Sequence, residues 1–85
     1  MTENIQQPRL FVDFHNSDHL GRVRLNTVGT IQDLNQLGVI LREGAEILIY
    51  CHEAEAEATA TYSKEEGLWV AVIDWSRMRE LPGNR

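Results

Sequence analysis

Residues 53–62 alternate strictly between two kinds of side chain. Even positions carry alanine and finally tyrosine, whereas odd positions carry glutamate or threonine. Alanine and glutamate favour helices by composition. A helix would spread this alternation around its whole circumference, but a strand places the two kinds of side chain on opposite faces. We therefore predict a turn near 53–56 and a strand over about 57–63, and the rest of the fold depends on this prediction.

The stretch Leu68–Trp75 predicts the next strand. It combines β-branched and aromatic residues, is apolar on both of its alternating faces, and holds both tryptophans of the chain. Such a run is typical of a strand covered on both sides. Residues 63–67 fit a hairpin loop with Gly67 in a left-handed conformation. We predict that Leu68–Trp75 is the central strand of a small β domain.

Alternating apolar residues predict two strands near the start of the chain, at about 9–15 and 22–26, with a turn-rich loop over 16–21 between them. We expect these strands to form a hairpin with acids and arginines opposite each other on its outer face. Residues 45–51 are apolar on nearly every position, which indicates an interior strand.

One short helix is predicted between the second and third strands. Thr30 is a suitable N-cap, and Gly38 fits the position that ends a helix. The apolar stripe that would dock this helix on the sheet recurs at helical spacing, at Ile31, Leu34 and Leu37. A longer helix ending at Gly44 is the alternative, disfavoured because a glycine inside a helix costs about 1 kcal/mol.

These elements predict a mainly β fold, a five-stranded antiparallel and strongly curved sheet or small barrel. In element order and length the chain resembles SH3-like barrels. A β-grasp-like ββαββ sheet is the alternative if the helix reaches Arg42. We expect one domain over 1–85, ordered over about 9–81, with flexible tails at 1–8 and 82–85. A closing helical turn is expected at 76–81, with Trp75 and Met78 at one end of the core.

Charge and cysteine content exclude several classes of partner. The chain carries 13 acids against 8 bases, for a net charge of −5, and its arginines are scattered, so nucleic acid is not an expected partner. No apolar run approaches the roughly 18 residues that span a bilayer, and residues 1–8 lack the features of a secretory signal, so no membrane is expected. The single cysteine, Cys51, forms no internal disulfide, which predicts a reducing cytoplasm.

Four polar residues are the candidate metal ligands: Asp13, His15, Asp18 and His19. Such N and O ligands bind zinc and similar ions, and a small metal-dependent or acid–base enzyme would use Asp13, His15 and His19. Their spacing matches no established metal motif. We therefore favour a solvated hairpin whose acids pair with nearby arginines, and we assign no metal or other cofactor.

Two other groups of reactive residues have structural interpretations. Cys51 and His52 are neighbours on a predicted strand, so their side chains point to opposite faces and Cys51 is expected to be a buried, inert thiol. The glutamates at 53, 55 and 57, continued at 65 and 66, form an acidic face. It lacks the glycine of a calcium loop, and we interpret it as a solvated edge strand whose charges prevent aggregation.

The aromatic residues give the leading functional hypothesis. They cannot all be central in so small a domain, and four of them are candidates for an exposed binding face: Phe11, Tyr50, Trp69 and Trp75. We predict a non-enzymatic protein-interaction module of a bacterial-type cytoplasmic protein, which binds a partner through this face or through a sheet edge. The alternatives are the enzyme described above and a structural subunit whose apolar patch is covered by a second copy.

Overall fold

The alternating segment forms the longest strand, β4 (Ala54–Ser63), in the computed structural model, which describes residues 7–81. Its four alanines are at most 9% exposed, whereas Glu57 and Thr59 face solvent. The strand prediction is therefore confirmed, and patterning overrides helix-favouring composition. The strand begins three residues earlier than expected, because the chain reverses at residues 51–53, where the Cys51 N–H donates to the Ala54 carbonyl at 2.9 Å.

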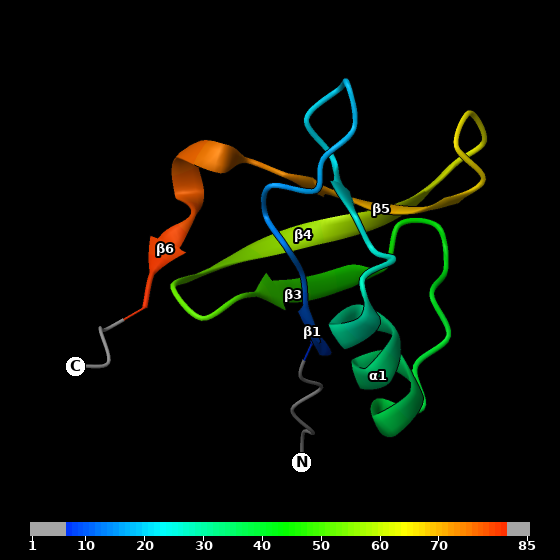
Figure 1. Cartoon of the computed structure of the whole chain (residues 1–85), viewed down its shortest axis with the longest axis horizontal. Helices are drawn as coiled ribbons and strands as arrows, with labels where there is room; N and C mark the ends of the chain where they lie inside the picture. Colours follow the sequence, from blue (N-terminus) through cyan, green and yellow to red (C-terminus); the bar gives the residue numbers. More distant parts are fainter. Residues whose placement is uncertain (1–6, 82–85) are drawn as a thin grey trace, which may run out of the picture.

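β4 is part of a curled sheet (Figure 1). Its other strands are β1 (Arg9–Phe11), β2 (Val23–Arg24), β3 (Glu46–Tyr50), β5 (Leu68–Ile73) and β6 (Arg79–Glu80). The order is β1-β3-β4-β5-β2, and β6 pairs with the start of β4. The mainly β, strongly curved, barrel-like fold with one short helix between the second and third strands is confirmed.

β5 is not the central strand, and this prediction is wrong. β4 lies in the middle of the sheet, whereas β5 lies between β4 and the two-residue strand β2. The outer face of β5 is also incompletely covered, since Val72 is 45% exposed. The strand ends at Ile73, and the 3-10 helix η1 (Trp75–Arg77) replaces the closing turn expected at 76–81.

The first strand does not form the expected hairpin. β1 pairs in parallel with β3, and the expected strand over 9–15 is cut short at Phe11 by a turn that the Asn16 N–H and the Asp13 carbonyl close (2.8 Å). The chain resumes pairing at Ser17, which bridges to Val23 of β2. Residues 9–17 thus contact β3 at one end and β2 at the other, which bends the sheet into a half-barrel (Figure 1).

The helix α1 (Val28–Leu37) ends where predicted but begins earlier. Gly38 adopts a left-handed conformation (φ 67°) and caps the helix, so the alternatives that depended on a helix reaching Arg42 or Gly44 are excluded. Thr27, not Thr30, is the N-cap. The predicted apolar stripe is largely wrong: Leu34 packs on the core, but Ile31 and Leu37 are 45% and 54% exposed.

The core lies on the inner face of the sheet, where large aliphatic side chains of β1, β2 and β3 pack against the small alanines of β4. Its largest fully buried members are Leu10, Val12, Val23, Ile47 and Ile49. Met78 packs against this core as expected, whereas Trp75 is 44% exposed. The expected tails fall mainly on 1–6 and 82–85, outside the described residues. Neither helix within residues 7–81 is long and apolar enough to cross a membrane.

Candidate functional site

β1 lies at one end of the sheet order, and the direction of its hydrogen bonds determines what its outer edge offers. The Val12 N–H donates to the Tyr50 carbonyl, and the Leu48 N–H donates to the Pro8 carbonyl, at 2.8 and 2.9 Å. Successive residues of a strand point their backbone groups in alternate directions. The N–H and C=O of Phe11 therefore point away from β3, toward α1.

Two side chains of α1 bind both of these outward backbone groups. The Phe11 N–H donates to Asp33 Oδ2 at 2.8 Å, and the Thr30 hydroxyl donates to the Phe11 carbonyl. Thr30 is fully buried, so its hydroxyl cannot exchange this bond for water. At this one residue, α1 supplies the hydrogen bonds that a neighbouring strand would supply, which fixes the helix against the sheet edge.

Tyr50 connects this edge to a group of aromatic and cationic side chains. Its hydroxyl donates to Asp33 Oδ2 at 3.0 Å, and its ring meets the Phe11 ring edge-on at 5.6 Å. The Arg9 guanidinium stacks over the Tyr50 ring at 4.2 Å, and His52 lies 5.9 Å from Phe11. Burial, together with the hydrogen bond to the Asp33 carboxylate, raises the pKa of Tyr50. Tyr50 is therefore a neutral donor at physiological pH.

A groove of about 560 Å³ opens between β1 and α1. One side is polar, formed by Arg9, Asp33 and Gln36. The apolar side chains are Leu37, at the end of α1, and Val39, just after the helix cap. The remaining lining residues are Gln7, Pro8 and Tyr50. A concave, mainly apolar surface with a few fixed polar groups is typical of a binding site.

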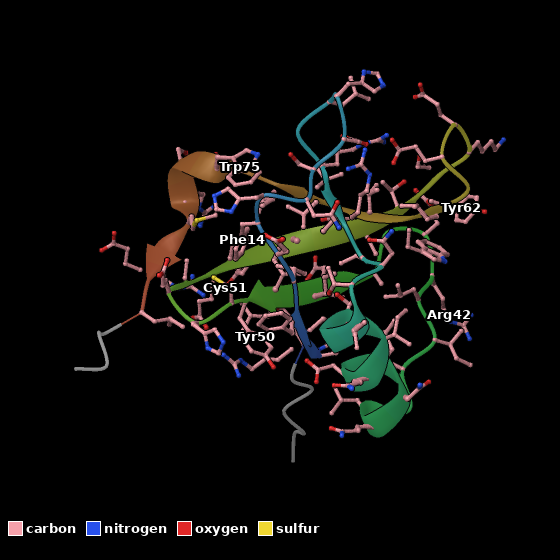
Figure 2. All side chains as sticks on the ribbon, viewed as in Figure 1. Phe14, Arg42, Tyr50, Cys51, Tyr62 and Trp75 are labelled. Carbon is pink, nitrogen blue, oxygen red and sulfur yellow. The ribbon has the colours of Figure 1, made fainter. Side chains whose placement is uncertain are left out.

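The four aromatic candidates fall at three places. Phe11 and Tyr50 are in contact beside this groove, as their pairing in β1 and β3 requires. Trp69 instead meets Tyr62 at 5.3 Å. Trp75 contacts Phe14 at 6.1 Å, and its indole N–H donates to the Gly21 carbonyl. Figure 2 shows Tyr50, Tyr62 and Trp75 well apart, so the expected single aromatic face is divided.

The four candidate metal ligands do not converge. The His15 N–H donates to Asp13 Oδ1 at 2.9 Å, and the His15 ring lies 3.6 Å from the same oxygen. Asp18 is buried and bonded to its own loop, whereas His19 pairs with Glu65 at 3.0 Å. Within residues 7–81, no group of three or more His, Cys, Asp or Glu side chains could hold a metal ion.

Asp18 has a structural role in the loop over 16–21. It accepts hydrogen bonds from the Leu20 and Arg22 N–H groups and from Arg22 Nε, at 2.8–2.9 Å. Burial alone would raise the pKa of Asp18, but the hydrogen bonds and charge of Arg22 outweigh it and lower that pKa. Arg24, one of the arginines of the expected hairpin, forms its two-point ion pair outside that hairpin, with Glu66 (2.7 and 2.8 Å).

The pair formed by His19 and Glu65 should be detectable as a shift in the pKa of His19. The hydrogen bond that the His19 ring donates to the Glu65 carboxylate raises the pKa of His19 above its ordinary value of about 6.5. We expect the replacement Glu65→Gln to lower the His19 pKa, measured from its ring proton shifts by NMR. The matched change Glu57→Gln, on β4 and away from this loop, should leave the His19 pKa unchanged.

The sign of the pH effect follows from the direction of this shift. The folded state binds the His19 proton more tightly than the unfolded state, so the pair stabilises the fold fully below the unfolded pKa. That contribution disappears as the pH rises through the folded pKa. An unchanged His19 pKa in the Glu65→Gln variant would show that the two loops are not connected through this pair.

Cys51 and His52 lie in the turn between β3 and β4 rather than on a strand. The Cys51 sulfur accepts from the Glu53 N–H at 3.4 Å, and its side chain is only partly buried. The expectation of a buried thiol is therefore corrected, because the strand ends at Tyr50 and leaves Cys51 in the turn.

The acidic face is not an edge strand, because β4 pairs on both sides. Glu55 is bonded by Arg79 at 2.9 Å and lies 3.5 Å from Arg9, and the hydrogen bonds of Arg79 lower its pKa. A second, smaller hollow of about 270 Å³ lies on this outer face. Its charged lining consists of Glu46, Glu57, Asp74, Arg77 and Arg79, a mixed set with no common ligand chemistry.

Several residues of the β1–α1 groove were not identified from the sequence. Asp33, which lines the groove, was not singled out, because an acid three residues after Thr30 also fits a local capping pattern. Thr30, which binds Phe11 beside the groove, was interpreted only as the N-cap. One signal does distinguish Asp33, which is the only charged residue between Arg24 and Arg42. Comparisons with protein-family models, curated proteins and solved structures gave no match. A function must therefore be inferred from the contacts in and beside the β1–α1 groove.

Proposed function

We propose that this chain is a non-enzymatic protein-interaction module that binds an extended segment of a partner protein in the β1–α1 groove. The observation that carries the proposal is the set of hydrogen bonds at the outer edge of β1. The side chains of Thr30 and Asp33 bind the outward backbone groups of Phe11 as a strand would. The groove begins directly beside that point, at Arg9.

Strand addition is the binding mode that this edge supports. By the alternation of backbone directions, the N–H and C=O of Arg9 point the same way as those of Phe11, toward the groove. A partner segment lying there extends the sheet by one strand through backbone hydrogen bonds. We infer a cytoplasmic setting for this interaction, which the single cysteine supports.

The side chains of the groove define the segment that fits. Leu37 and Val39 form a wall for an aliphatic side chain. The Arg9 side chain is half exposed and already faces the Glu55 carboxylate at 3.5 Å, so a carboxylate of the partner can share it. The preferred partner therefore presents an extended segment with an aliphatic residue near an acidic one.

Selection from a random peptide display library on the immobilised full-length chain tests the proposal. Peptides that are recovered are titrated into the labelled protein and followed by NMR. We expect the largest shift changes at Arg9, Leu37, Val39 and Tyr50. The replacement Leu37→Lys should weaken binding about tenfold or more, which corresponds to roughly 1.4 kcal/mol.

Leu20→Lys is the matched control, since Leu20 is a similarly exposed leucine (62% against 54%) in a loop that does not line the groove. It should leave peptide binding unchanged. The proposal is wrong if no peptide binds, if binding maps to another surface, or if both lysine variants bind as the parent chain does.

A further inference from the structure

The outer edge of β1 is open at one end and closed at the other. At the open end, the backbone groups of Arg9 face the β1–α1 groove. At the closed end, Asp33 and Thr30 bind the N–H and C=O of Phe11. α1 lies beside β1 (Figure 1) and leaves no space there, since a Cβ on Gly29 would lie 2.5 Å from the Phe11 ring. A strand that is added along the groove must therefore end beside Phe11.

The Asp33 carboxylate lies at this closed end and uses only one of its two oxygens. The hydrogen bonds that it accepts, from the Phe11 N–H and the Tyr50 hydroxyl, both go to Oδ2. Among residues 7–81, none donates to Oδ1, and every buried side-chain oxygen has a partner, so Oδ1 is accessible. Asp33 also lines the β1–α1 groove. One oxygen therefore fixes the carboxylate, and the other is available to a bound molecule.

The negative charge of Asp33 has no cationic partner in the part of the chain that the structure describes. Other acids that the fold holds in place are paired with arginines: Asp18 with Arg22, Glu66 with Arg24, and Glu55 with Arg79. The two donors to Asp33 are instead a backbone N–H and a tyrosine hydroxyl, which are neutral. The charge of this carboxylate is therefore complementary to a cationic group of the partner.

We propose that the β1–α1 groove binds the free N-terminus of the partner protein, with the terminal ammonium group on Asp33. This inference rests on the proposed function, in which an extended partner segment adds to β1. A segment that runs antiparallel to β1 places its first residue at the closed end, beside Phe11. A protein N-terminus has a pKa of about 8, so it is charged at neutral pH and donates charge-assisted hydrogen bonds to a carboxylate.

The closed end disfavours the other occupants with a similar shape. A segment parallel to β1 would place its C-terminal carboxylate beside Asp33, where two like charges repel each other. A lysine within a longer segment also carries an ammonium group, but the chain that precedes it would have to turn away from the sheet at Phe11. A terminal residue needs no such turn. The acidic and aliphatic side chains of the partner then belong to its first few residues, because Arg9 is only two residues from the closed end.

Two random peptide libraries, selected on the immobilised full-length chain, test this proposal. One library displays its random segment with a free N-terminus, and the other displays the same segment between two glycine–serine linkers. We expect binders from the first library and few from the second. A recovered peptide is then synthesised with a free and with an acetylated N-terminus. Acetylation removes the charge and should weaken binding about tenfold or more, since it removes a hydrogen bond between charged groups.

The replacement Asp33→Asn tests the role of the carboxylate. Asparagine keeps an oxygen that accepts from the Phe11 N–H, but it has no charge. It should weaken binding of the free peptide about tenfold and leave binding of the acetylated peptide nearly unchanged. Asp13→Asn is the matched control, because Asp13 is an exposed acid that does not line the groove. It should change neither affinity, and circular dichroism should show that both variants are folded.

The outcomes separate this inference from the proposed function. Equal recovery from the two libraries, or an acetylated peptide that binds as tightly as the free one, would overturn N-terminal recognition and leave the interaction module standing. If Asp33→Asn weakens both peptides equally, Asp33 only holds α1 in place, and the assignment of the ammonium group to it is wrong. If neither library yields a binder, the proposed function itself fails.

Discussion

The replacement Ala60→Lys is expected to destabilise the fold by about 3–5 kcal/mol, the cost of leaving a charge buried without a partner. Ala60 is fully buried and lies opposite Ala71 of β5, in the middle of the core. The added side chain has no room there, and its ammonium group has no acceptor among alanine and valine side chains. Since a domain of this size is only marginally stable, most of the chain should unfold.

Thr59→Lys is the matched control for this change. It places the same side chain one residue earlier on β4, on the opposite face, where Thr59 is exposed and lies opposite Glu46 of β3. The lysine then gains an opposite charge across the strands, so stability should change by no more than about 0.5 kcal/mol. Urea unfolding followed by circular dichroism measures both variants. Equal destabilisation at the two positions would refute the assignment of the faces of β4.

The alternation of β4 could be predicted from the sequence, because the face on which each side chain of a strand lies is set by local spacing. From Ala54 to Ala60 every second residue is buried, so Ala58 and Ala60 lie on the same side whatever their partners are. The alternation of burial ends there, because Tyr62, which shares the parity of the alanines, is 44% exposed. The identity of the central strand could not be predicted in the same way. The apolar run of β5 resembles a strand covered on both faces, but which strand lies in the middle depends on the pairing of the others.

The parallel pairing of β1 with β3 is a non-local contact that no periodicity specifies. Strand 9–15 was expected to pair with its neighbour in sequence, which is the commoner arrangement. The turn at Asp13 interrupts it, and the pairing moves to Ser17 and Val23. The sequence around Asp13 fits a strand equally well, so the break appears only in the structure.

The candidate site was predictable only in part. Phe11 and Tyr50 were identified as aromatic candidates, and their contact follows from the pairing of β1 with β3. Thr30 and Asp33 reach Phe11 across 19 and 22 residues of sequence, through side chains that bond to backbone groups. Such contacts leave no pattern in the sequence, because serine, threonine and aspartate near a helix start also fit ordinary capping roles.

The replacement Gly29→Ala is expected to destabilise the protein, although it adds a better helix former to α1. In an exposed helix position this change would gain about 1 kcal/mol. Here a Cβ on residue 29 would lie 2.5 Å from Cδ2 of Phe11, which is well inside contact distance. The Phe11 ring is held between the helix and the Tyr50 ring, so it cannot move away freely. We expect a net loss of about 1–3 kcal/mol, the usual cost of overpacking.

Asn35→Ala separates helix propensity from this close contact. Asn35 is an exposed residue of α1, so alanine there should stabilise the fold by a few tenths of a kcal/mol, roughly its helix-propensity gain. Thermal unfolding of both variants should therefore give shifts of opposite sign. Two shifts of the same sign, both upward, would mean that Phe11 does not pack on Gly29. Because Phe11 also positions Tyr50, Gly29→Ala should weaken peptide binding in the β1–α1 groove as well, whereas Asn35→Ala should not.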